Sequence, residues 1–572
     1  MSTLFLIPAR GGSRRIPAKN LRLLAGIPLV GWAARIAQAA AGPTDIVLCT
    51  TDDPAIAAAA ATWGATILER PAALATDEAT SVAVALHALD TLEERGTPPD
   101  LLVLIQPTSP LTDPADLVAA VDLARRSGRP VVTVAASHPA AWHQRLDADG
   151  TLRALDDAAE ATAGDATPTH LLTGAAYAVT PTALRASGRF LEPGQVLGLA
   201  VPIERSVDID EPADIVVAAA MLRARPITPV RIGSTVLGAG RPFVIAEAGV
   251  NHDGDVAAAH RLIDAAADVG ADAVKFQTFV PAALAAPSAP TAAYQRDRAG
   301  DDQQAAMLER LRLPDDAWAA LQAHAGERGI VFLSTPFDAA SAALLDALDV
   351  PAFKVGSGEL TNLPFLAELA AYGRPLLIST GMATMVEVAA AVNTVRAAGP
   401  AEIALLHCVS AYPALVEDAN LAAMVSMRDA FAVPTGWSDH TPGMELPVAA
   451  TALGAAIIEK HLTLDRSRPG PDHAMSMEPD AFAAMVQAIH GTAAALGDGV
   501  KQPTEAEAAI AAVARRSLHW ARDLPAGSEV AMADLVAIRP GTGLSPARSA
   551  DIIGRHTSRA VRGGEALAEA DL

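Results

Sequence analysis

Short apolar runs alternate with Ala-rich stretches along residues 1–228. Four runs have the length and composition typical of buried strands, at residues 3–9, 45–51, 100–106 and 130–136. Residues 29–40 (LVGWAARIAQAA) have the apolar spacing of a helix. The alternation predicts a parallel sheet covered by helices on both faces.

A Pro- and Gly-rich segment, Arg223 to Pro242, then predicts a domain boundary followed by a short hairpin. Eight more strand candidates follow, separated mostly by helical stretches, at residues 243–249, 273–279, 330–337, 352–358, 375–380, 403–409, 433–439 and 455–462. Eight βα units over roughly 250 residues are typical of a TIM (β/α)8 barrel.

Polar residues interrupt these eight strands near their carboxyl ends. They are Glu247, Lys275, Gln277, Thr335, Lys354, Ser379, His407, His440 and His461. Because the carboxyl ends of all barrel strands converge on one mouth, we expect an active site there.

The end of the chain has a different pattern. A polar stretch after Asp498 predicts a linker, and short apolar patches separated by Gly- and Pro-containing turns predict a small, compact β-rich domain. We therefore expect four segments, at residues 1–228, 229–500, 501–514 and 515–572.

Composition narrows the functional classes. The 572 residues carry a net charge of −22, which argues against binding to nucleic acid or to an anionic membrane. No apolar run reaches the ~18 residues of a membrane span, and the first residues lack the pattern of a signal peptide. Cys49 and Cys408 lie far apart in apolar runs, so we expect neither a disulfide framework nor a thiolate metal cluster. These features predict a cytoplasmic protein.

Lysine is rare in this chain, with five lysines against 38 arginines. Lys19 follows a Gly-rich loop, and Lys275 and Lys354 end apolar runs. A residue used so sparingly is expected where a compact ammonium group is needed rather than a planar guanidinium. Binding of phosphate or carboxylate is such a role.

The segment Ile7–Asn20 (IPARGGSRRIPAKN) leaves the first strand through two glycines. Their backbone can approach a phosphate closely, and the neighbouring arginines and Lys19 offset its charge. Asp208 and Asp210 share one face of an extended run. Paired carboxylates suit a Mg²⁺ ion that bridges a triphosphate.

The segments PARGGSRRIPAKN, ERPAALATDEATS, LIQPTSPL and SVDIDEPAD occur in this order and together resemble the acylneuraminate cytidylyltransferases, or CMP-sialic acid synthetases. The resemblance implies a Rossmann-like nucleotidyltransferase domain that couples CTP to a nonulosonic acid. It assigns the nucleotide to Arg10, Ser13, Lys19, Asn20, Arg70, Ser81 and Gln106, with catalytic roles for Arg10 and Lys19. It assigns the sugar acid to Gln106 and Tyr177, and Mg²⁺ to Asp208 and Asp210.

Three departures from this family fall on the sugar-acid side. Thr112 follows PTSPL where many relatives have Arg, and Thr173 precedes Gly174 where Asn is usual. The residues after His138-Pro139 lack the usual Lys. The identity of the sugar is therefore open.

The mouth of the expected barrel offers both cations and metal ligands. Lys275 and Lys354, with neighbouring hydroxyl groups, could form a cradle for a phosphorylated carboxylate. His440 and His461 end consecutive strands. Imidazole ligands with carboxylates and without thiolate suit Mn²⁺ or another borderline divalent metal.

The segments EAGVNHDG, VKFQTF, KVGSGE, LLHCVSAYP, SDHT, EKHLTLDRSRPGPDH and IRPGTG resemble the sialic acid synthase family, including its C-terminal antifreeze-protein-like domain. The resemblance implies condensation of phosphoenolpyruvate with an N-acylated mannosamine-type hexosamine. It implies catalytic roles for Glu247, Lys275, Lys354 and Glu359, and substrate binding by Lys275, Gln277, Thr335, Lys354, Ser357, Ser379, Tyr412, Ser438, Asp472 and Arg539. His440 and His461 would bind the metal, and Arg539 would reach the barrel of a partner subunit in a homodimer or higher homo-oligomer.

Together the two resemblances predict a bifunctional enzyme that makes a nonulosonic acid and then activates it with CTP. Two alternatives stay open, an N-terminal domain that binds a nucleotide without catalysis, and an eight-carbon Kdo-type pathway. Ser410 stands where sialic acid synthases have Asn. N-acetylneuraminic, legionaminic and pseudaminic acid therefore all remain candidate products.

Overall fold

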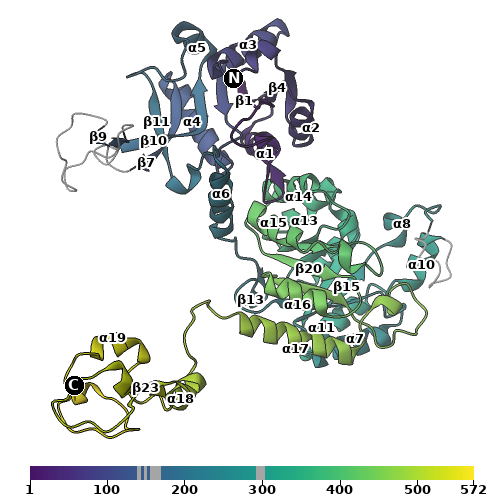
Figure 1. The fold of residues 1–572 in the computed structure, drawn as a ribbon. Coiled ribbons are helices and arrows are strands. Elements are labelled where there is room, and N and C mark those ends of the chain that lie inside the picture. Colours follow the sequence, from purple (N-terminus) through teal and green to yellow (C-terminus); the bar gives the residue numbers. More distant parts are fainter. Residues whose placement is uncertain (138–143, 147–150, 155–168, 291–302) are drawn as a thin grey trace. The chain divides into compact units, whose positions relative to one another are not determined.

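The computed structural model describes residues 1–137, 144–146, 151–154, 169–290 and 303–572. The chain forms two compact units, Met1–Ala495 and Leu496–Leu572. The first unit contains a seven-stranded sheet and a closed eight-stranded barrel (Figure 1). Within the described residues, no helix is both long enough and apolar enough to cross a membrane.

The N-terminal sheet has the strand order β11-β7-β10-β6-β1-β4-β5. Its strands are β1 (Thr3–Pro8), β4 (Ile46–Thr51), β5 (Thr66–Glu69), β6 (Leu101–Ile105), β7 (Val131–Ser137), β10 (Thr169–Val179) and β11 (Leu197–Val201). The expectation of a wholly parallel sheet is wrong at β10, which runs antiparallel to β6 and β7. Because β10 returns directly beside β7, it needs no crossover helix.

Successive side chains of β1 point to opposite faces of the sheet, and each face is covered by its own hydrophobic core. Phe5 and Ile7 are buried in one core and Leu4 and Leu6 in the other. The first core includes residues of α1 (Leu29–Ala40), α2 (Pro54–Thr62), α4 (Pro114–Ser127) and α6 (Pro212–Ala224), and the second includes residues of α3 (Ser81–Glu94) and α5 (Pro181–Ser187). Helices therefore cover both faces, as the alternation predicts.

The barrel consists of eight parallel strands that pair in sequence order and close between the first and the last. They are β14 (Phe243–Gly249), β15 (Ala273–Thr278), β16 (Val331–Pro336), β17 (Phe353–Val355), β18 (Leu376–Ser379), β19 (Ile403–Cys408), β20 (Thr435–Asp439) and β21 (Ile457–His461). All eight strand candidates are confirmed.

Helices alternate with the barrel strands along the chain. They are α7 (Val256–Asp268), α11 (Ala317–Glu327), α12 (Ala339–Ala347), α13 (Leu363–Ala371), α14 (Met385–Ala398), α15 (Ala422–Phe431), α16 (Glu445–Ala452) and α17 (Pro479–Leu496). Two short helices, α8 (Pro281–Leu284) and α10 (Gln304–Leu311), are inserted between β15 and α11.

Short β-hairpins complete the first unit. The hairpin expected before the barrel is formed by β12 (Arg231–Ile232) and β13 (Thr235–Val236), and its buried Ile232 packs with Phe243 and Ile457 at the amino ends of the barrel strands. The other pairs are β2 (Leu23–Leu24) with β3 (Ile27–Pro28), and β8 (Gln144–Leu146) with β9 (Leu152–Ala154).

The second unit has its own core, in which Trp520 and Leu567 are fully buried. Strands β22 (Ser517–Trp520) and β23 (Leu535–Ile538) pair antiparallel with each other. The rest of this unit contains isolated β-bridges, a short helix α19 (Ser549–Ile552) and single helical turns. The stretch expected as a linker contains helix α18 (Glu505–Ala514), because Thr504 and Glu507 form a capping box ahead of an Ala-rich sequence.

Candidate active sites

All eight barrel strands contribute side chains to one cavity of about 450 Å³. Each strand places one of the following residues in its lining, in chain order: Glu247, Lys275, Thr335, Lys354, Ser379, Cys408, Ser438 and Glu459. The mouth expected from the sequence therefore exists. It also brings in Gln277, Ser357, Glu359, Tyr412, His440, His461 and Asp472.

His407 does not line this cavity, contrary to the expectation. Its Nε2 lies 2.9 Å from the carbonyl oxygen of Ala419, and its ring packs against Trp437. Successive side chains of a strand point to opposite faces, so Cys408 faces the mouth and His407 faces outward.

Two lysines and two glutamates form a buried cluster at the centre of the mouth. Lys275 Nζ lies 2.6 Å from Glu247 Oε2 and 3.9 Å from Glu459 Oε2, and Lys354 Nζ lies 3.2 Å from Glu459 Oε1. Lys275 donates to Thr335 Oγ1 at 3.2 Å, and Lys354 donates to Ser379 Oγ at 2.8 Å. Both ammonium groups are thus held in place before any substrate binds.

Burial and neighbouring charges shift the pKa values of the two glutamates in opposite directions. Burial raises the pKa of Glu247, although Lys275 opposes the rise. The pKa of Glu459 is lowered despite burial, because Lys275 and Lys354 both attract its charge. The two ammonium groups at the centre of the mouth suit an anionic ligand.

His440 and His461 lie on one side of the mouth with ring centroids 5.6 Å apart. His440 Nδ1 lies 2.7 Å from the carbonyl oxygen of Val409, which leaves its Nε2 for a ligand. His461 Nδ1 is buried without a hydrogen-bond partner. Burial lowers the pKa of both imidazoles and so keeps them in the neutral form that binds metals.

This pair fits a divalent metal that takes further ligands from water or substrate. A neutral imidazole whose other nitrogen is fixed by a backbone carbonyl is the usual arrangement of a ligating histidine. Among the residues described, no group of three or more His, Cys, Asp and Glu side chains is arranged around a metal position.

The remaining predicted residues of the mouth surround this centre. Tyr412 packs against His440 with ring centroids 4.3 Å apart, and Asp472 Oδ2 lies 3.9 Å from His461 Nδ1. Gln277 donates to Glu247 Oε1 at 3.0 Å, and Glu359 accepts from the amide of Asn362 at 2.9 Å. These contacts hold four polar groups around the space where a sugar would lie.

Ser357 and Ser410 lie together beside Gly381. Ser357 Oγ accepts from the amide of Gly381 at 3.0 Å and lies 3.2 Å from Cys408 Sγ. A Cβ on Gly381 would collide with the Ser410 hydroxyl, so glycine is needed there. Ser410, the departure at the expected N-acyl position, thus belongs to the cavity wall.

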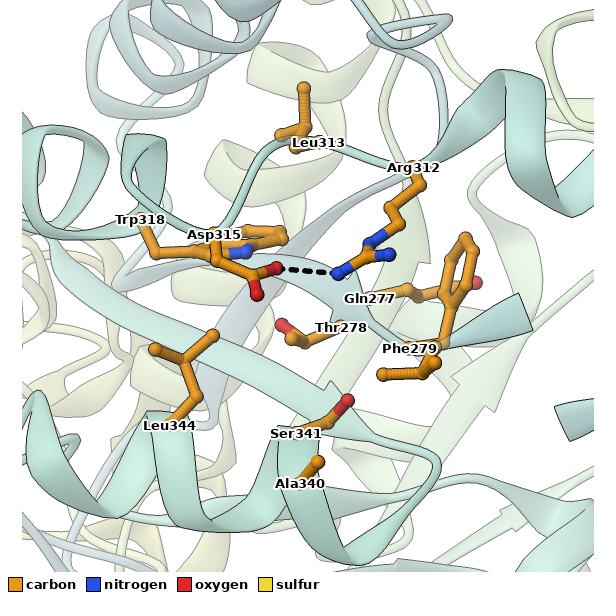
Figure 2. A pocket seen from close by; sticks show the side chains of 11 residues that line it. Gln277, Thr278, Phe279, Arg312, Leu313, Asp315, Trp318, Ala340, Ser341 and Leu344 are labelled. Carbon is orange, nitrogen blue, oxygen red and sulfur yellow. Dashed lines mark hydrogen bonds and ion pairs between the residues drawn. The ribbon is translucent and has the colours of Figure 1, made fainter. Parts of the chain in front are cut away.

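A smaller cavity of about 70 Å³ shares Gln277 and Phe279 with the mouth. Figure 2 shows that Arg312 and Asp315 face each other across its edge, and their ion pair is 2.9 Å long. Trp318 and Leu344 close the cavity from the helices behind. Its volume is too small for a sugar.

The nucleotide residues expected in the N-terminal domain line a second large cavity, of about 570 Å³. All seven contribute to its lining: Arg10, Ser13, Lys19, Asn20, Arg70, Ser81 and Gln106. Arg70 donates to the carbonyl of Thr50 at 2.6 Å, and Asn20 donates to the carbonyl of Arg10 at 2.9 Å. The glycine loop is therefore held against the strand ends.

The cationic side chains of this cavity form ion pairs with acidic side chains. Arg10 pairs with Asp77 at 2.6 Å, and Arg14 pairs with the same carboxylate. Lys19 and Arg15 pair with Asp210 at 3.1 and 3.2 Å. A triphosphate would have to displace these exposed carboxylates, which hold the cations only weakly in water.

Asp208 and Asp210 flank Ile209, whose carbonyl accepts from Lys19 at 3.0 Å. Burial raises the pKa of Asp208, and the charge of Asp210 adds to the rise. A hard cation would relieve this repulsion, so the pair fits Mg²⁺. Of the two, Asp210 lines the nucleotide cavity.

Tyr177, Thr112 and Thr173 are not part of the lining of the nucleotide cavity. Thr112 and Thr173 are two of the positions that differ from the cytidylyltransferase pattern. Tyr177 packs against Phe190 at 5.7 Å between ring centroids. Thr112 donates to the carbonyl of Ser109, and the hydroxyl of Thr173 lies 2.7 Å from that of Thr133. The departure at His138-Pro139 and the residues just after it lie outside the described residues.

From the sequence, Glu459 is expected only as a carboxylate near His440 and His461, and its contacts with both lysines are not anticipated. The presence of Asp77 in the nucleotide cavity is not anticipated either. Glu459 stands two residues before His461, so strand alternation places both side chains on the same face. Arg539 lies exposed beyond the end of β23 in the second unit.

Comparisons with known proteins agree with both halves of this picture. Residues 262–501 match the model of the NeuB family, and residues 4–169 match the cytidylyltransferase model. N,N'-diacetyllegionaminic acid synthase of Legionella pneumophila is 43% identical over 330 residues, which are 57% of this chain and 93% of the relative.

Two further relatives cover a similar share of the chain. N,N'-diacetyllegionaminic acid synthase of Campylobacter jejuni is 40% identical over 332 residues, 58% of this chain and 99% of the relative. Pseudaminic acid synthase of Helicobacter pylori is 32% identical over 332 residues, 58% of this chain and 98% of the relative.

Proposed function

Because the chain belongs to the NeuB family and carries a cytidylyltransferase domain, we propose that it performs two consecutive reactions. The barrel condenses phosphoenolpyruvate with an N-acylated mannosamine-type hexosamine to a nonulosonic acid. The N-terminal domain then couples that acid to CMP from CTP. The observation that supports this most is the single cavity lined by Lys275, Lys354, His440 and His461.

In this proposal the two lysines bind the phosphate and carboxylate of phosphoenolpyruvate. Thr335 and Ser379 already orient the ammonium groups, so little side-chain entropy is lost when the anion binds. Charge-assisted hydrogen bonds from the two ammonium groups favour the enol phosphate over neutral ligands.

The condensation joins C3 of phosphoenolpyruvate to the aldehyde carbon of the open-chain sugar. Water adds at C2 and inorganic phosphate leaves, which gives the 2-keto acid. Glu247 is the candidate base for this water, because it lines the mouth and burial raises the pKa of its carboxyl group, which makes the carboxylate more basic. A divalent ion at His440 and His461, Mn²⁺ by the chemistry of these ligands, would polarise the aldehyde when bound. Gln277, Tyr412 and Asp472 would orient the sugar.

In the second reaction the anomeric hydroxyl of the acid attacks the α-phosphorus of CTP, and pyrophosphate leaves. Lys19 and Arg10 would hold the phosphates through charge-assisted hydrogen bonds. Asp208 and Asp210 would hold a Mg²⁺ ion, which would offset the negative charge of the triphosphate when bound. We also propose that Arg539 completes the barrel site of a partner subunit in a homodimer.

The names of the relatives bear on the acceptor sugar. The two relatives with the higher identities are named for a product with two N-acetyl groups. This favours a diacylated acceptor over N-acetylmannosamine.

Two matched variants test the assignment of one activity to each domain. Lys354→Ala removes one of the two phosphoenolpyruvate cations, so synthase kcat/KM should fall about 30-fold or more, with CMP transfer to supplied sugar acid unchanged. Lys19→Ala should lower only CMP transfer. Lys501→Ala, at an exposed lysine, is the control. If Lys19→Ala left CMP transfer intact, or the wild-type protein made no CMP conjugate, the N-terminal domain would be a binding module.

A further inference from the structure

Strands β20 and β21 are joined at their carboxyl ends by a buried ion pair that does not line the mouth. Lys460 forms this pair with Asp439, and the two side chains are 3% and 0% exposed. The two residues stand opposite each other in the register of the strands. Side chains alternate along β21, so Glu459 and His461 take the mouth face and Lys460 takes the other face.

The same ammonium group also holds the turn that carries His440. It donates to the carbonyl oxygen of Thr441 at 2.6 Å. Asp439 Oδ1 accepts from the backbone N–H and from the hydroxyl of Thr441, at 3.0 and 2.7 Å. Lys460 on β21 therefore contacts the residues on both sides of His440, and it directly precedes His461 in the chain.

Stability alone does not explain an ion pair at this position. Burial takes both charged groups out of water, and their mutual attraction offsets little more than that loss. The two strand ends are also tied on the mouth face, where Ser438 donates to Glu459 Oε1 at 2.9 Å. A second, charged link on the opposite face restricts the strand ends to one arrangement, because a buried charge must keep its partner.

We infer that Asp439 and Lys460 are positioning residues for the two histidines of the mouth. The ion pair and its contacts with Thr441 set the spacing and the relative orientation of His440 and His461. Both imidazoles are thereby arranged for one divalent ion before the ion binds. This inference rests on the metal site of the proposed synthase function.

The test is a titration of the intact protein with Mn²⁺ alone, with free Mn²⁺ followed by electron paramagnetic resonance. The main variant is Asp439→Asn/Lys460→Met. It removes one charge of each sign, so the net charge near the histidines stays the same, and the new amide oxygen can still accept from Thr441. The Kd of the barrel site should rise about 10- to 100-fold, as when other groups that orient metal ligands are replaced. His440→Ala, which removes a proposed ligand, identifies the part of the signal that belongs to the barrel.

Two further variants separate positioning from a general loss of stability. Leu345→Ala leaves a cavity behind α12, which lies between β16 and β17 in the chain. Its melting temperature should fall while its Kd for Mn²⁺ stays at the wild-type value. Thr441→Val removes only the hydroxyl contact with Asp439, so it disturbs the fold least, and its Kd should rise several-fold.

Wild-type affinity for Mn²⁺ in the folded double variant would overturn the inference. If that variant does not fold, wild-type affinity in Thr441→Val would overturn it instead. An equal loss of affinity in Leu345→Ala would also overturn it, because affinity would then follow stability alone. A wild-type barrel that binds no Mn²⁺ would refute the metal role of both histidines and this inference with it. Failure of the proposed synthase is a different result, since the wild-type protein would bind Mn²⁺ but consume no phosphoenolpyruvate.

Discussion

At Lys354, burial lowers the pKa of the ammonium group even though Glu459 Oε1 lies 3.2 Å from it. Lys275 next to it keeps a raised pKa, because Glu247 and Glu459 both stabilise its charge. The two cations proposed to bind phosphoenolpyruvate therefore differ in how they respond to pH. Lys354 loses its proton first as the pH rises.

This difference predicts an alkaline limit on phosphoenolpyruvate use. As the pH rises through the lowered pKa of Lys354, its positive charge is lost. The value of kcat/KM for phosphoenolpyruvate should therefore start to fall at a pH below ~10.4, the pKa of an ordinary lysine. Arginine keeps its charge to higher pH than lysine, so in Lys354→Arg the fall of kcat/KM should occur at a higher pH. The overall activity of this variant should be lower. A pH profile of kcat/KM from 6 to about 10.5 measures this. An unchanged alkaline limb in Lys354→Arg would contradict it, and Lys501→Ala should match the wild type.

Lysine scarcity predicted function at some positions better than at others. Lys19, Lys275 and Lys354 line the two large cavities. Lys460 does not line them, since it forms a buried ion pair with Asp439 and donates to the carbonyl of Thr441. Rarity alone therefore does not separate the lysines that line a cavity from a lysine held in an internal ion pair.

Among the elements, the barrel strands were the most predictable, because strand length and strand-end polarity repeat eight times. β10 was not predicted, since its Gly- and Thr-containing sequence lies next to a long polar stretch. The position of α10 in the wall of the barrel mouth could not be predicted either. The spacing of its apolar residues indicates a helix. Helical periodicity does not say which surface the apolar face of a helix covers, and in the structure this face lines the mouth.

The close contact between β20 and β21 gives a prediction at this scale. A Cβ on Gly436 would collide with the carbonyl oxygen of Ile457 on the neighbouring strand. Gly436→Ala should therefore destabilise the barrel by about 1–3 kcal/mol and displace His440 and His461 at the ends of these strands. Gly491→Ala, where the helix α17 leaves open space, should instead stabilise it by about 0.5–1 kcal/mol. Thermal unfolding followed by circular dichroism compares the two. Equal melting temperatures for both variants would contradict the clash.

For the whole molecule, the sequence predicted a Rossmann-like nucleotidyltransferase fold followed by a TIM barrel, and the seven-stranded sheet and the closed barrel confirm this fold class. In the proposed function, fusion would keep the two domains in equal amounts and would raise the effective concentration of one domain near the other. The sugar was not predictable, because the departures at Thr112, Thr173 and Ser410 remove familiar contacts without indicating new ones.

The most direct test is the mass of the product that the intact protein makes from phosphoenolpyruvate, a diacetamido hexose, CTP, Mn²⁺ and Mg²⁺. The account predicts a CMP-linked nine-carbon acid, with one phosphate and one pyrophosphate released per molecule formed. Phosphoenolpyruvate left unconsumed, or a free nonulosonic acid that never acquires CMP, would contradict it.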